Sequence, residues 1–255
     1  MRTLIVILTF CACWLNANAQ LHFIPADSIV TWDSDVANLR NTALEASAHL
    51  TPQYISADFS QEKMLQTSWE KEVGKHNMNP FAIANRFTLA AKLLTLTADA
   101  KYALEIEQLI YKALLQQAST PTLSAEKVTA AQTLLNAVGT MLATQGDTLY
   151  LNYYANSTAT IPTSKGSLQL DIVTGMPFHE RVKFRFARMT QPKGMQVTIC
   201  LRLPEGAWND TSFPIYCNGH DTPYHIEKGY AVITNIWRPG FEIYFDLPEP
   251  LLRLE

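Results

Sequence analysis

The chain has 255 residues, of which 20 are Lys or Arg and 23 are Asp or Glu, so its formal net charge is −3. The basic residues are scattered, which argues against nucleic acid or an anionic membrane surface as a partner. Beyond the first twenty residues no segment is long and apolar enough to cross a bilayer as a helix, so we expect no membrane span. The length suffices for one large domain or two small ones.

The first residues have the organisation of a cleavable export signal. A basic residue precedes the apolar run Leu4–Leu15, and small residues stand one and three positions before the peptide bond that follows Ala19. The run is too short to anchor the chain in a membrane. We therefore expect residues 1–19 to be a signal peptide and the protein to be secreted or periplasmic. A lipoprotein signal at Cys11 or Cys13 is the less favoured alternative, because the aromatic residue before them fits that motif poorly.

A helical pattern follows an irregular segment, Gln20 to Thr31. Side chains that can cap a helix precede apolar residues spaced three and four apart, and a proline follows Asn79 at a first helical position. The pattern predicts about five helices in hairpins with short connections. We expect them from Asp35 to Leu50, from Gln61 to Val73, from Pro80 to a break at Thr97-Ala98-Asp99, from there to Leu114, and from Ser124 to Leu142.

At Gly146-Asp147 the pattern changes to short β-branched and aromatic runs separated by Gly, Pro, Asn and Asp. The number of these runs and their spacing along the chain predict an antiparallel β-sandwich. The candidate strands are Leu149–Tyr154, Gly166–Val173, Glu180–Phe186, Met195–Leu203, Phe213–Cys217, Tyr230–Ile236 and Phe241–Leu247. We therefore expect an α+β protein in two parts, with N-terminal helical hairpins in residues 20–145 and the sandwich in residues 146–255.

The last two candidate strands predict a hairpin over Gly229–Leu247. Both runs alternate apolar and other residues, as half-buried strands do. Arg238-Pro239-Gly240-Phe241 joins them, and its proline and glycine suit a type II turn. We expect one buried face on each strand. These faces consist of Tyr230, Val232 and Ile236 on the first strand and Phe241, Ile243, Phe245 and Leu247 on the second.

Two cysteines, Cys200 and Cys217, lie beyond the signal, each in a strand-like run. In an exported protein they can pair as a disulfide, or both can be buried free thiols. Without clustered histidines they are poor evidence for a metal site. We expect no metal and no other cofactor.

Several short motifs in the second half occur in an order and at separations that resemble the C-terminal β-sandwich region of glycoside hydrolase family 127, the β-L-arabinofuranosidase family. They are Leu149-Tyr150-Leu151-Asn152-Tyr153-Tyr154, Ser157-Thr158-Ala159, Arg202-Leu203-Pro204-Glu205-Gly206-Ala207-Trp208, Cys217-Asn218-Gly219, Gly229-Tyr230 and Trp237-Arg238-Pro239-Gly240. Residues 85–115 are similar to the paired helices before that family's catalytic loop, so the resemblance covers about residues 80–255.

The resemblance implies an α/α barrel that carries a cysteine nucleophile, held with zinc by further cysteines and a glutamate. The cysteine run would fall near Ser124-Ala125-Glu126, and no cysteine occurs between Ala19 and Ile199. Serine or alanine cannot replace an activated thiolate or a thiolate zinc ligand. The helices are also too few to close such a barrel. We therefore expect a truncated, partial barrel-like region and no reaction of the family's kind.

Other residues capable of catalysis carry weaker signals. The acidic residues Glu105, Glu107, Glu126 and Asp147 could serve sugar hydrolysis as a carboxylate pair, but we expect solvated surface charges, with Glu105 and Glu107 on different helix faces. Neighbouring histidine and acid pairs, at His179-Glu180 and His220-Asp221, accompany no recognisable nucleophile turn. A helix cap accounts for Ser124 in the Ser124–Lys127 spacing.

Aromatic side chains are the strongest indication of a ligand. Trp208, Tyr224 and Tyr153, with His220 nearby in sequence, could offer flat faces and polar groups to a sugar. Large rings in sandwiches are usually core, which we expect for Trp237 and Tyr230 and which is the alternative for the others.

These observations predict an exported, non-catalytic relative of the family that binds polysaccharide or oligosaccharide as a binding or accessory protein. One alternative is a divergent glycoside hydrolase that uses relocated carboxylates. Another is a structural module that completes a partner chain. The sequence leaves the ligand and the oligomeric state open.

Overall fold

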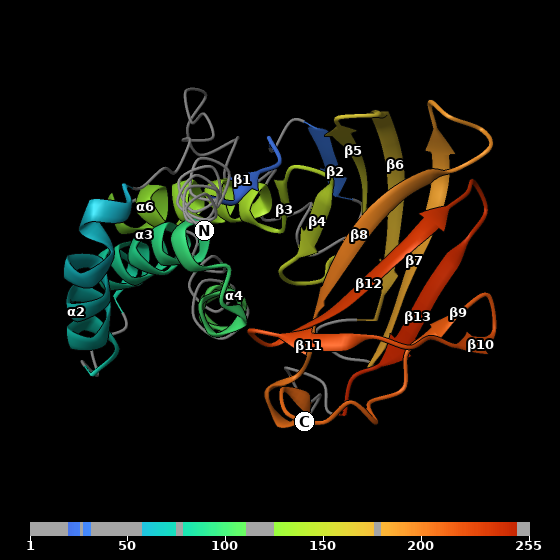
Figure 1. The fold of residues 1–255 in the computed structure, drawn as a ribbon. Coiled ribbons are helices and arrows are strands. Elements are labelled where there is room, and N and C mark those ends of the chain that lie inside the picture. The colour runs from blue at the N-terminus through green and yellow to red at the C-terminus, as the bar shows by residue number, and fades with distance from the viewer. Residues whose placement is uncertain are drawn as a thin grey trace, which may run out of the picture.

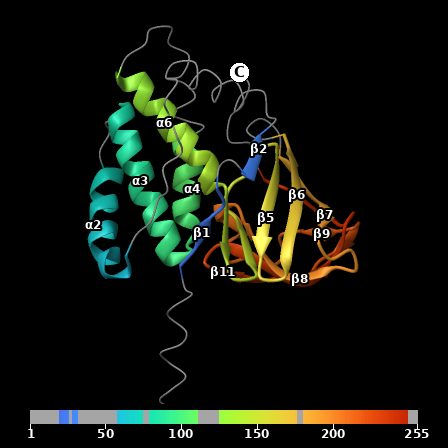
Figure 2. The ribbon, with the colours of Figure 1, turned by 90° about the horizontal axis from the view of Figure 1, so that it is seen from above.

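The structure is a computed structural model that describes residues 20–25, 28–31, 58–74, 79–110, 125–175 and 180–248. In these ranges helices gather on one side of the molecule and strands on the other (Figures 1 and 2). The helices are α2 (Glu62–Val73), preceded by the 3-10 turn η2 (Phe59–Gln61), α3 (Pro80–Thr97), α4 (Ala100–Gln108) and α6 (Ala125–Thr140). No helix among these ranges is long and apolar enough to cross a membrane.

Capping side chains start two of the helices where the sequence predicts. The Asn79 side chain accepts a hydrogen bond from the Ala82 amide at 2.9 Å, and Asp99 accepts one from the Lys101 amide at 3.0 Å. Between α3 and α4, Ala98 takes a left-handed conformation that ends α3. The helix expected from Asp35 to Leu50 lies outside the described residues.

The strands form two sheets, in which every pair is antiparallel except β4 with β8. The six-stranded sheet has the order β1 (His22–Phe23), β3 (Leu142–Gln145), β4 (Thr148–Leu151), β8 (Met195–Arg202), β12 (Tyr230–Trp237) and β11 (His225–Glu227). The seven-stranded sheet has the order β10 (His220–Asp221), β9 (Tyr216–Cys217), β13 (Glu242–Asp246), β7 (Arg181–Met189), β6 (Gly166–Thr174), β5 (Ser157–Thr163) and β2 (Ile29–Thr31). Each of the seven candidate strands overlaps one of these, and the α+β class is confirmed.

The N-terminal segment is not irregular as predicted, because it supplies a strand to each sheet. His22 pairs with Thr144 of β3, and Ile29 pairs with Ala159 of β5. Leu21 and Ile24 are buried beside these pairings. Strands of two or three residues are too short to show an alternating pattern, so only their tertiary partners define them.

The other end of the helical region also differs from its prediction. Helix α6 ends at Thr140, whereas the sequence extended it to Leu142, which instead begins β3. Strands β3 and β4 then pair as a hairpin. The predicted boundary between residues 145 and 146 therefore falls in the turn of that hairpin.

The turn predicted at Arg238-Pro239-Gly240-Phe241 is present, but the strands on either side of it do not form a hairpin. The Phe241 amide donates to the Arg238 carbonyl at 3.1 Å, and Gly240 has the positive φ of 89° that such a turn needs. However, β12 pairs with β8 and β11, whereas β13 pairs with β7 and β9 in the other sheet. The turn therefore carries the chain from one sheet to the other.

Backbone contacts of this turn explain the change of sheet. The Gly240 amide donates to the Phe186 carbonyl at 2.7 Å, and the Phe186 amide donates to the Phe241 carbonyl at 2.9 Å. These hydrogen bonds place the segment that follows the turn beside β7. The predicted buried face of β12 is also corrected, because Ile236 is 52% exposed while Ile233 and Trp237 are buried.

Aromatic rings from both sheets form the centre of the core. Trp237 of β12 stacks on Phe186 of β7, with ring centroids 4.8 Å apart. Tyr154, which follows β4, contacts Phe184 and Phe245 of the seven-stranded sheet edge to face at 5.6 Å each. The prediction that Trp237 is a core residue is confirmed.

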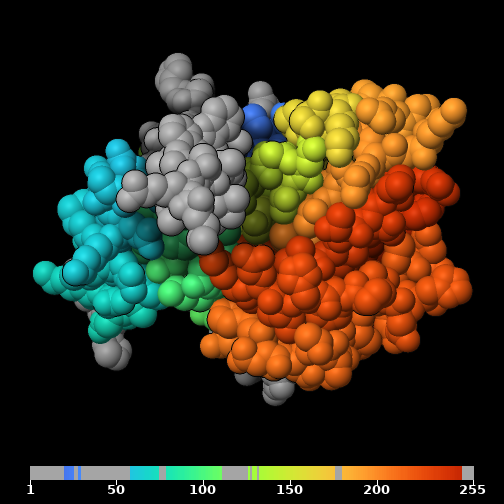
Figure 3. All heavy atoms as spheres, viewed as in Figure 1, coloured from blue at the N-terminus to red at the C-terminus, as the bar shows by residue number. Residues whose placement is uncertain are grey.

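The turn between β11 and β12 joins the helices to the six-stranded sheet (Figures 1 and 3). The Lys228 carbonyl accepts from the Ala100 amide at 2.9 Å, and the Lys228 ammonium donates to the Thr97 carbonyl at 2.7 Å. Gly229, at φ +82°, follows so closely that a Cβ there would lie 2.6 Å from the Ala100 Cβ. Only glycine fits this position, both by conformation and by space.

Replacing Gly229 with alanine should lower the free energy of unfolding by about 2 kcal/mol or more, because backbone strain adds to overpacking against α4. Urea denaturation followed by circular dichroism measures the loss. Gly219→Ala is the matched control, since Gly219 has a φ of +84° but open space around its Cβ position. Equal losses in both variants would show that the contact with α4 contributes nothing.

Candidate functional site

A buried ion pair lies where α4 meets the six-stranded sheet. Glu107 of α4 is 1% exposed and Arg202, the last residue of β8, is 2% exposed. The Arg202 Nη2 group donates to the Glu107 Oε2 atom. Charged side chains are almost never this buried unless they are paired, so this pair is the most unusual polar feature of the described core.

A network of hydrogen bonds surrounds the Arg202 side of the pair. The Arg202 Nε group donates to the Asn152 carbonyl at 2.6 Å, and the Tyr154 hydroxyl donates to the Arg202 carbonyl at 2.5 Å. The Asn152 side chain accepts from the Tyr230 hydroxyl at 2.8 Å and donates to the Thr140 carbonyl at 2.8 Å. The network therefore connects α4 and the end of α6 to β8 and β12.

Electrostatics at this cluster are dominated by burial. Burial raises the pKa of Glu107, and the Arg202 charge and the Tyr154 backbone amide only partly oppose that rise. Glu107 Oε1 is buried with no hydrogen-bond partner in the described part of the chain. Burial also raises the pKa of Tyr154 and of Tyr230. Since all these groups are closed off from solvent, the cluster ties helices to the sheet and offers no acid or base to a sugar.

The prediction that the four acidic candidates are solvated surface charges is wrong for Glu107 and largely wrong for Glu105. The Glu105 side chain is 12% exposed and accepts a hydrogen bond from the Arg86 Nε group of α3 at 2.9 Å. Glu126 is exposed, as expected. Glu105 and Glu107 do lie on different faces of α4, because they pair with arginines from different elements.

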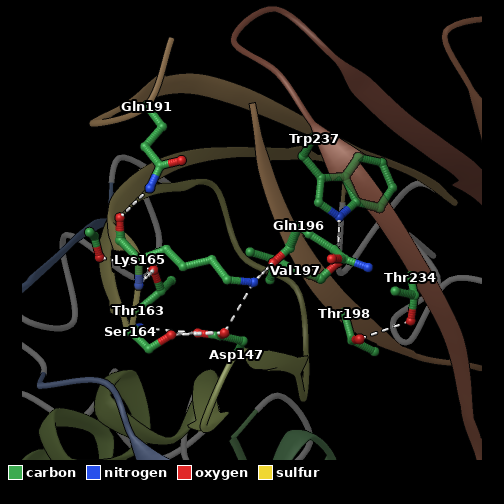
Figure 4. A network of polar contacts seen from close by, with 11 residues as sticks. Asp147, Thr163, Ser164, Lys165, Gln191, Gln196, Val197, Thr198, Thr234 and Trp237 are labelled. Carbon is green, nitrogen blue, oxygen red and sulfur yellow. Dashed lines mark hydrogen bonds and ion pairs between the residues drawn. The ribbon is translucent and has the colours of Figure 1, made fainter. Parts of the chain in front are cut away.

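Asp147 holds two hairpin turns together, one from each sheet (Figure 4). It lies in the β3–β4 turn and accepts from the Ser164 amide at 3.0 Å and from the Ser164 hydroxyl at 2.7 Å, both in the β5–β6 turn. The Lys165 ammonium lies 3.3 Å from its Oδ2 atom and also donates to the Gln196 carbonyl at 3.1 Å. The carboxylate is thus engaged in a contact between the sheets.

Replacing Asp147 with alanine should cost about 1 kcal/mol at pH 7, the net value of its hydrogen bonds. The Ser164 hydrogen bonds lower the pKa of Asp147 below its ordinary 3.8. A lowered folded pKa stabilises the fold above the unfolded value, and the effect is lost as the pH falls through the folded pKa. The difference between D147A and wild type should therefore shrink between pH 5 and pH 3 in urea denaturation.

The control for this comparison is Asp221→Ala, which removes an exposed carboxylate from β10. Asp221→Ala should change stability by no more than about 0.5 kcal/mol. If its pH dependence matches that of D147A, the effect comes from net charge and not from the Ser164 contacts.

The four residues predicted to bind a ligand have different surroundings in the structure. Trp208 is half-buried and its indole donates to the Leu203 carbonyl at 2.9 Å, while the Tyr224 hydroxyl donates to the Phe213 carbonyl at 2.7 Å. Tyr153 is buried and donates to the Ala137 carbonyl, so its ring cannot face a sugar at the surface. His220 is exposed in β10. No hydrogen bond or ring contact among the described residues joins any two of the four.

The two cysteines are free, which corrects the possible disulfide. Cys200 is buried in β8 of the six-stranded sheet, opposite Val232, whereas Cys217 is in β9 of the other sheet, opposite Ile243. Burial raises the pKa of Cys200 to about 12, and the charge of Glu227 adds to that rise. Such a thiol is inert at neutral pH.

An open groove of about 370 Å³ lies on the seven-stranded sheet, and none of the four predicted ligand-binding residues lines it. Its lining consists of Thr160, Ser167, Leu168, Gln169, Arg188, Met189 and Thr190. These residues carry no signal in the sequence, because nothing in an alternating strand pattern shows that three strands place polar groups side by side. Across the described residues, no group of three or more His, Cys, Asp or Glu side chains could hold a metal ion.

Comparison with known proteins connects the strand-rich part to one family. Residues 148–249 match the family described as Beta-L-arabinofuranosidase, GH127 middle domain. No curated protein matches the chain. Among solved structures, a GH127 β-arabinofuranosidase is 17% identical with a TM-score of 0.57, covering 66% of this chain and 32% of that chain.

Two further solved structures have similar folds. A GH127 β-L-arabinofuranosidase from Geobacillus stearothermophilus T6 is 16% identical with a TM-score of 0.59, covering 86% of this chain and 42% of that chain. A protein described as a glycoside hydrolase is 18% identical with a TM-score of 0.54, covering 66% of this chain and 32% of that chain. At these identities the likeness shows the fold alone, and the chain spans less than half the length of each. The resemblance seen in the sequence is confirmed for the strand-rich part: residues 148–249 match the GH127 β-L-arabinofuranosidase middle domain.

Proposed function

We propose that the chain is an exported, non-catalytic relative of the β-L-arabinofuranosidases that binds glycans or accompanies enzymes acting on them. The observation that carries this proposal is a GH127 middle domain together with a helical region that has no cysteine between Ala19 and Ile199. In this proposal the two sheets are the family's β-sandwich and the helices are part of an α/α barrel.

The missing cysteines matter because the family resemblance places nucleophile and zinc ligands on thiolates. Near the expected position the chain has Ser124-Ala125-Glu126. A serine there would need a new activating base, and alanine offers neither a nucleophile nor a metal ligand. A glycan can still bind to a surface that has lost this chemistry, because binding needs only hydrogen-bond partners and shape.

A relocated pair of carboxylates is less well supported by the contacts. Glu105 is paired with Arg86, Glu107 is buried against Arg202, and Asp147 is bound by Ser164. Turnover of aryl arabinofuranosides that one carboxylate substitution abolishes would establish the enzyme and overturn the non-catalytic proposal.

Calorimetric titration of the chain from Gln20 onward against arabinose-containing and other plant-wall glycans tests the binding proposal. Saturable binding without release of reducing sugar supports the binding proposal, and the absence of binding to every glycan tested contradicts it. Export is tested separately: N-terminal sequencing of protein from the periplasm or medium should begin at Gln20, and an intact Met1 would contradict cleavage.

A structural module that completes a partner chain is the second candidate. Large apolar side chains are exposed on and beside α2 and α3, namely Phe59, Met64, Val73 and Phe81, with exposed fractions from 39% to 60%. Exposed apolar side chains that gather in a patch mark interaction surfaces. Analytical ultracentrifugation at low and high protein concentration tests this candidate by measuring the molecular mass. A monomer mass at every concentration would show that the chain does not assemble with copies of itself.

A further inference from the structure

Three polar side chains stand in a row across the groove of the seven-stranded sheet. Thr160 of β5 is the register partner of Gln169 of β6, which is in turn the partner of Arg188 of β7. All three line the groove. Because neighbouring strands are about 4.8 Å apart, the backbones of Thr160 and Arg188 lie roughly 10 Å apart. It therefore presents three different hydrogen-bonding groups at one place on the sheet.

A β-bulge puts Arg188 in this row. Along β7, Val182, Phe184 and Phe186 are buried, so continued alternation would turn residue 188 toward the core. The register instead shifts between Gln169, which pairs with Arg188, and Leu170, which pairs with Phe186. Ala187 is the extra residue, and Arg188 is exposed. Bulges are common next to functional sites, where they redirect a side chain.

No acidic side chain among the described residues pairs with the Arg188 guanidinium. Among the outward cations nearer the start of β7, Arg181 pairs with Asp246 and Lys183 with Glu242 of β13, whereas Arg185, like Arg188, has no ion pair among the described residues. In the described ranges the Arg188 side chain forms no ion pair and no hydrogen bond, and the side chains of Thr160 and Gln169 form no hydrogen bond. The row thus keeps its full capacity to bind a ligand.

We propose that this groove binds an acidic sugar residue, with the Arg188 guanidinium on the sugar carboxylate and Gln169 and Thr160 on its hydroxyls. The guanidinium is planar and presents paired donors that match the two oxygens of a carboxylate. The carboxamide donates and accepts, and the hydroxyl does both, as sugar hydroxyls require. This inference rests on the proposed glycan binding and adds to it the ligand class and the binding surface.

Calorimetric titration with a galacturonic acid trisaccharide and with the neutral galactose trisaccharide tests the inference. We expect the wild type to prefer the acidic ligand and Arg188→Met to weaken that binding at least tenfold, with the neutral ligand almost unaffected. Arg185→Met is the matched control, because Arg185 is an exposed arginine of the same strand outside the groove. Gln169→Ala should weaken both ligands. Thermal melting confirms that each surface variant is folded.

Each result decides one of the two proposals. Loss of acidic binding in Arg188→Met but not in Arg185→Met supports the groove. Equal losses in both arginine variants, or no preference for the acidic ligand, overturns the groove while leaving glycan binding in place. If the wild type binds neither of these two sugars, the proposal that the groove binds an acidic sugar is wrong. If it binds no sugar of the whole glycan panel, the proposed function is wrong as well.

Discussion

Replacing Arg202 with methionine is expected to lower the free energy of unfolding by about 3–5 kcal/mol, since it leaves a buried carboxylate without its partner. Glu107 would keep its position at 1% exposure with no opposite charge beside it. The Asn152 carbonyl would also lose its hydrogen bond from Arg202. Urea denaturation followed by circular dichroism measures this loss.

The double variant Glu107→Leu with Arg202→Met should be markedly more stable than Arg202→Met alone, because no buried charge remains. The control is Arg181→Met, which breaks an exposed ion pair with Asp246 and should cost no more than about 1 kcal/mol. If Arg202→Met behaves like Arg181→Met, the junction between helices and sheet does not depend on this pair.

The same variant makes a pH prediction. Burial raises the pKa of Glu107, and Arg202 opposes that rise, so removing Arg202 raises the pKa further. A raised folded pKa favours the fold below the unfolded pKa, and this stability is lost as the pH rises through the folded pKa. The deficit of Arg202→Met should therefore be smaller at pH 5 than at pH 8. A deficit that does not change with pH would show that lost packing, and not the charge, sets it.

Replacing Trp237 with alanine is expected to cost about 3–5 kcal/mol, as is usual for a large ring removed from a packed core. Trp237 is fully buried, stacks on Phe186 and donates from its indole to the Val197 carbonyl at 2.9 Å. Trp237→Phe should lose less, because it keeps a ring against Phe186 and gives up only the hydrogen bond and part of the volume.

Chemical denaturation followed by far-ultraviolet circular dichroism measures these losses without relying on tryptophan fluorescence. Ile236→Ala is the matched control, since its side chain is the next one along β12 and is 52% exposed. We expect it to change stability by no more than about 0.5 kcal/mol. A loss in Ile236→Ala as large as that in Trp237→Ala would mean that the outer face of β12 is covered in solution.

Local signals made several elements predictable from the sequence. A capping side chain and a proline define the start of α3 at Asn79-Pro80 because both act on the first turn itself. The turn at Gly240 was predictable for a similar reason, since the preference of proline and glycine for particular φ values does not depend on the rest of the fold. The burial of Trp237 followed from its size, since large rings in such folds are usually core, whereas the alternation assigned to that strand placed Ile236 on the buried face instead.

The burial of Glu107 could not be predicted in the same way. In a helix pattern a glutamate between apolar residues reads as a surface charge, and its partner Arg202 is 95 residues away in the chain. The row of polar side chains in the groove was equally unpredictable. Thr160, Gln169 and Arg188 belong to three strands, and a bulge turns Arg188 outward. Neither arrangement leaves a local pattern.

Local patterns in the sequence showed where most helices and strands lie, which family the second half resembles, and that no cysteine stands between Ala19 and Ile199. Tertiary contacts were needed to show that β12 and β13 belong to different sheets, that β1 and β2 each form an edge of one sheet, and that the Arg188 side chain stands unpaired in a groove. The physical reason is the distance in sequence over which each interaction acts. Helix caps, turns and alternating strand patterns depend on residues a few positions apart, whereas strand pairing and charge burial depend on contacts between distant parts of the chain.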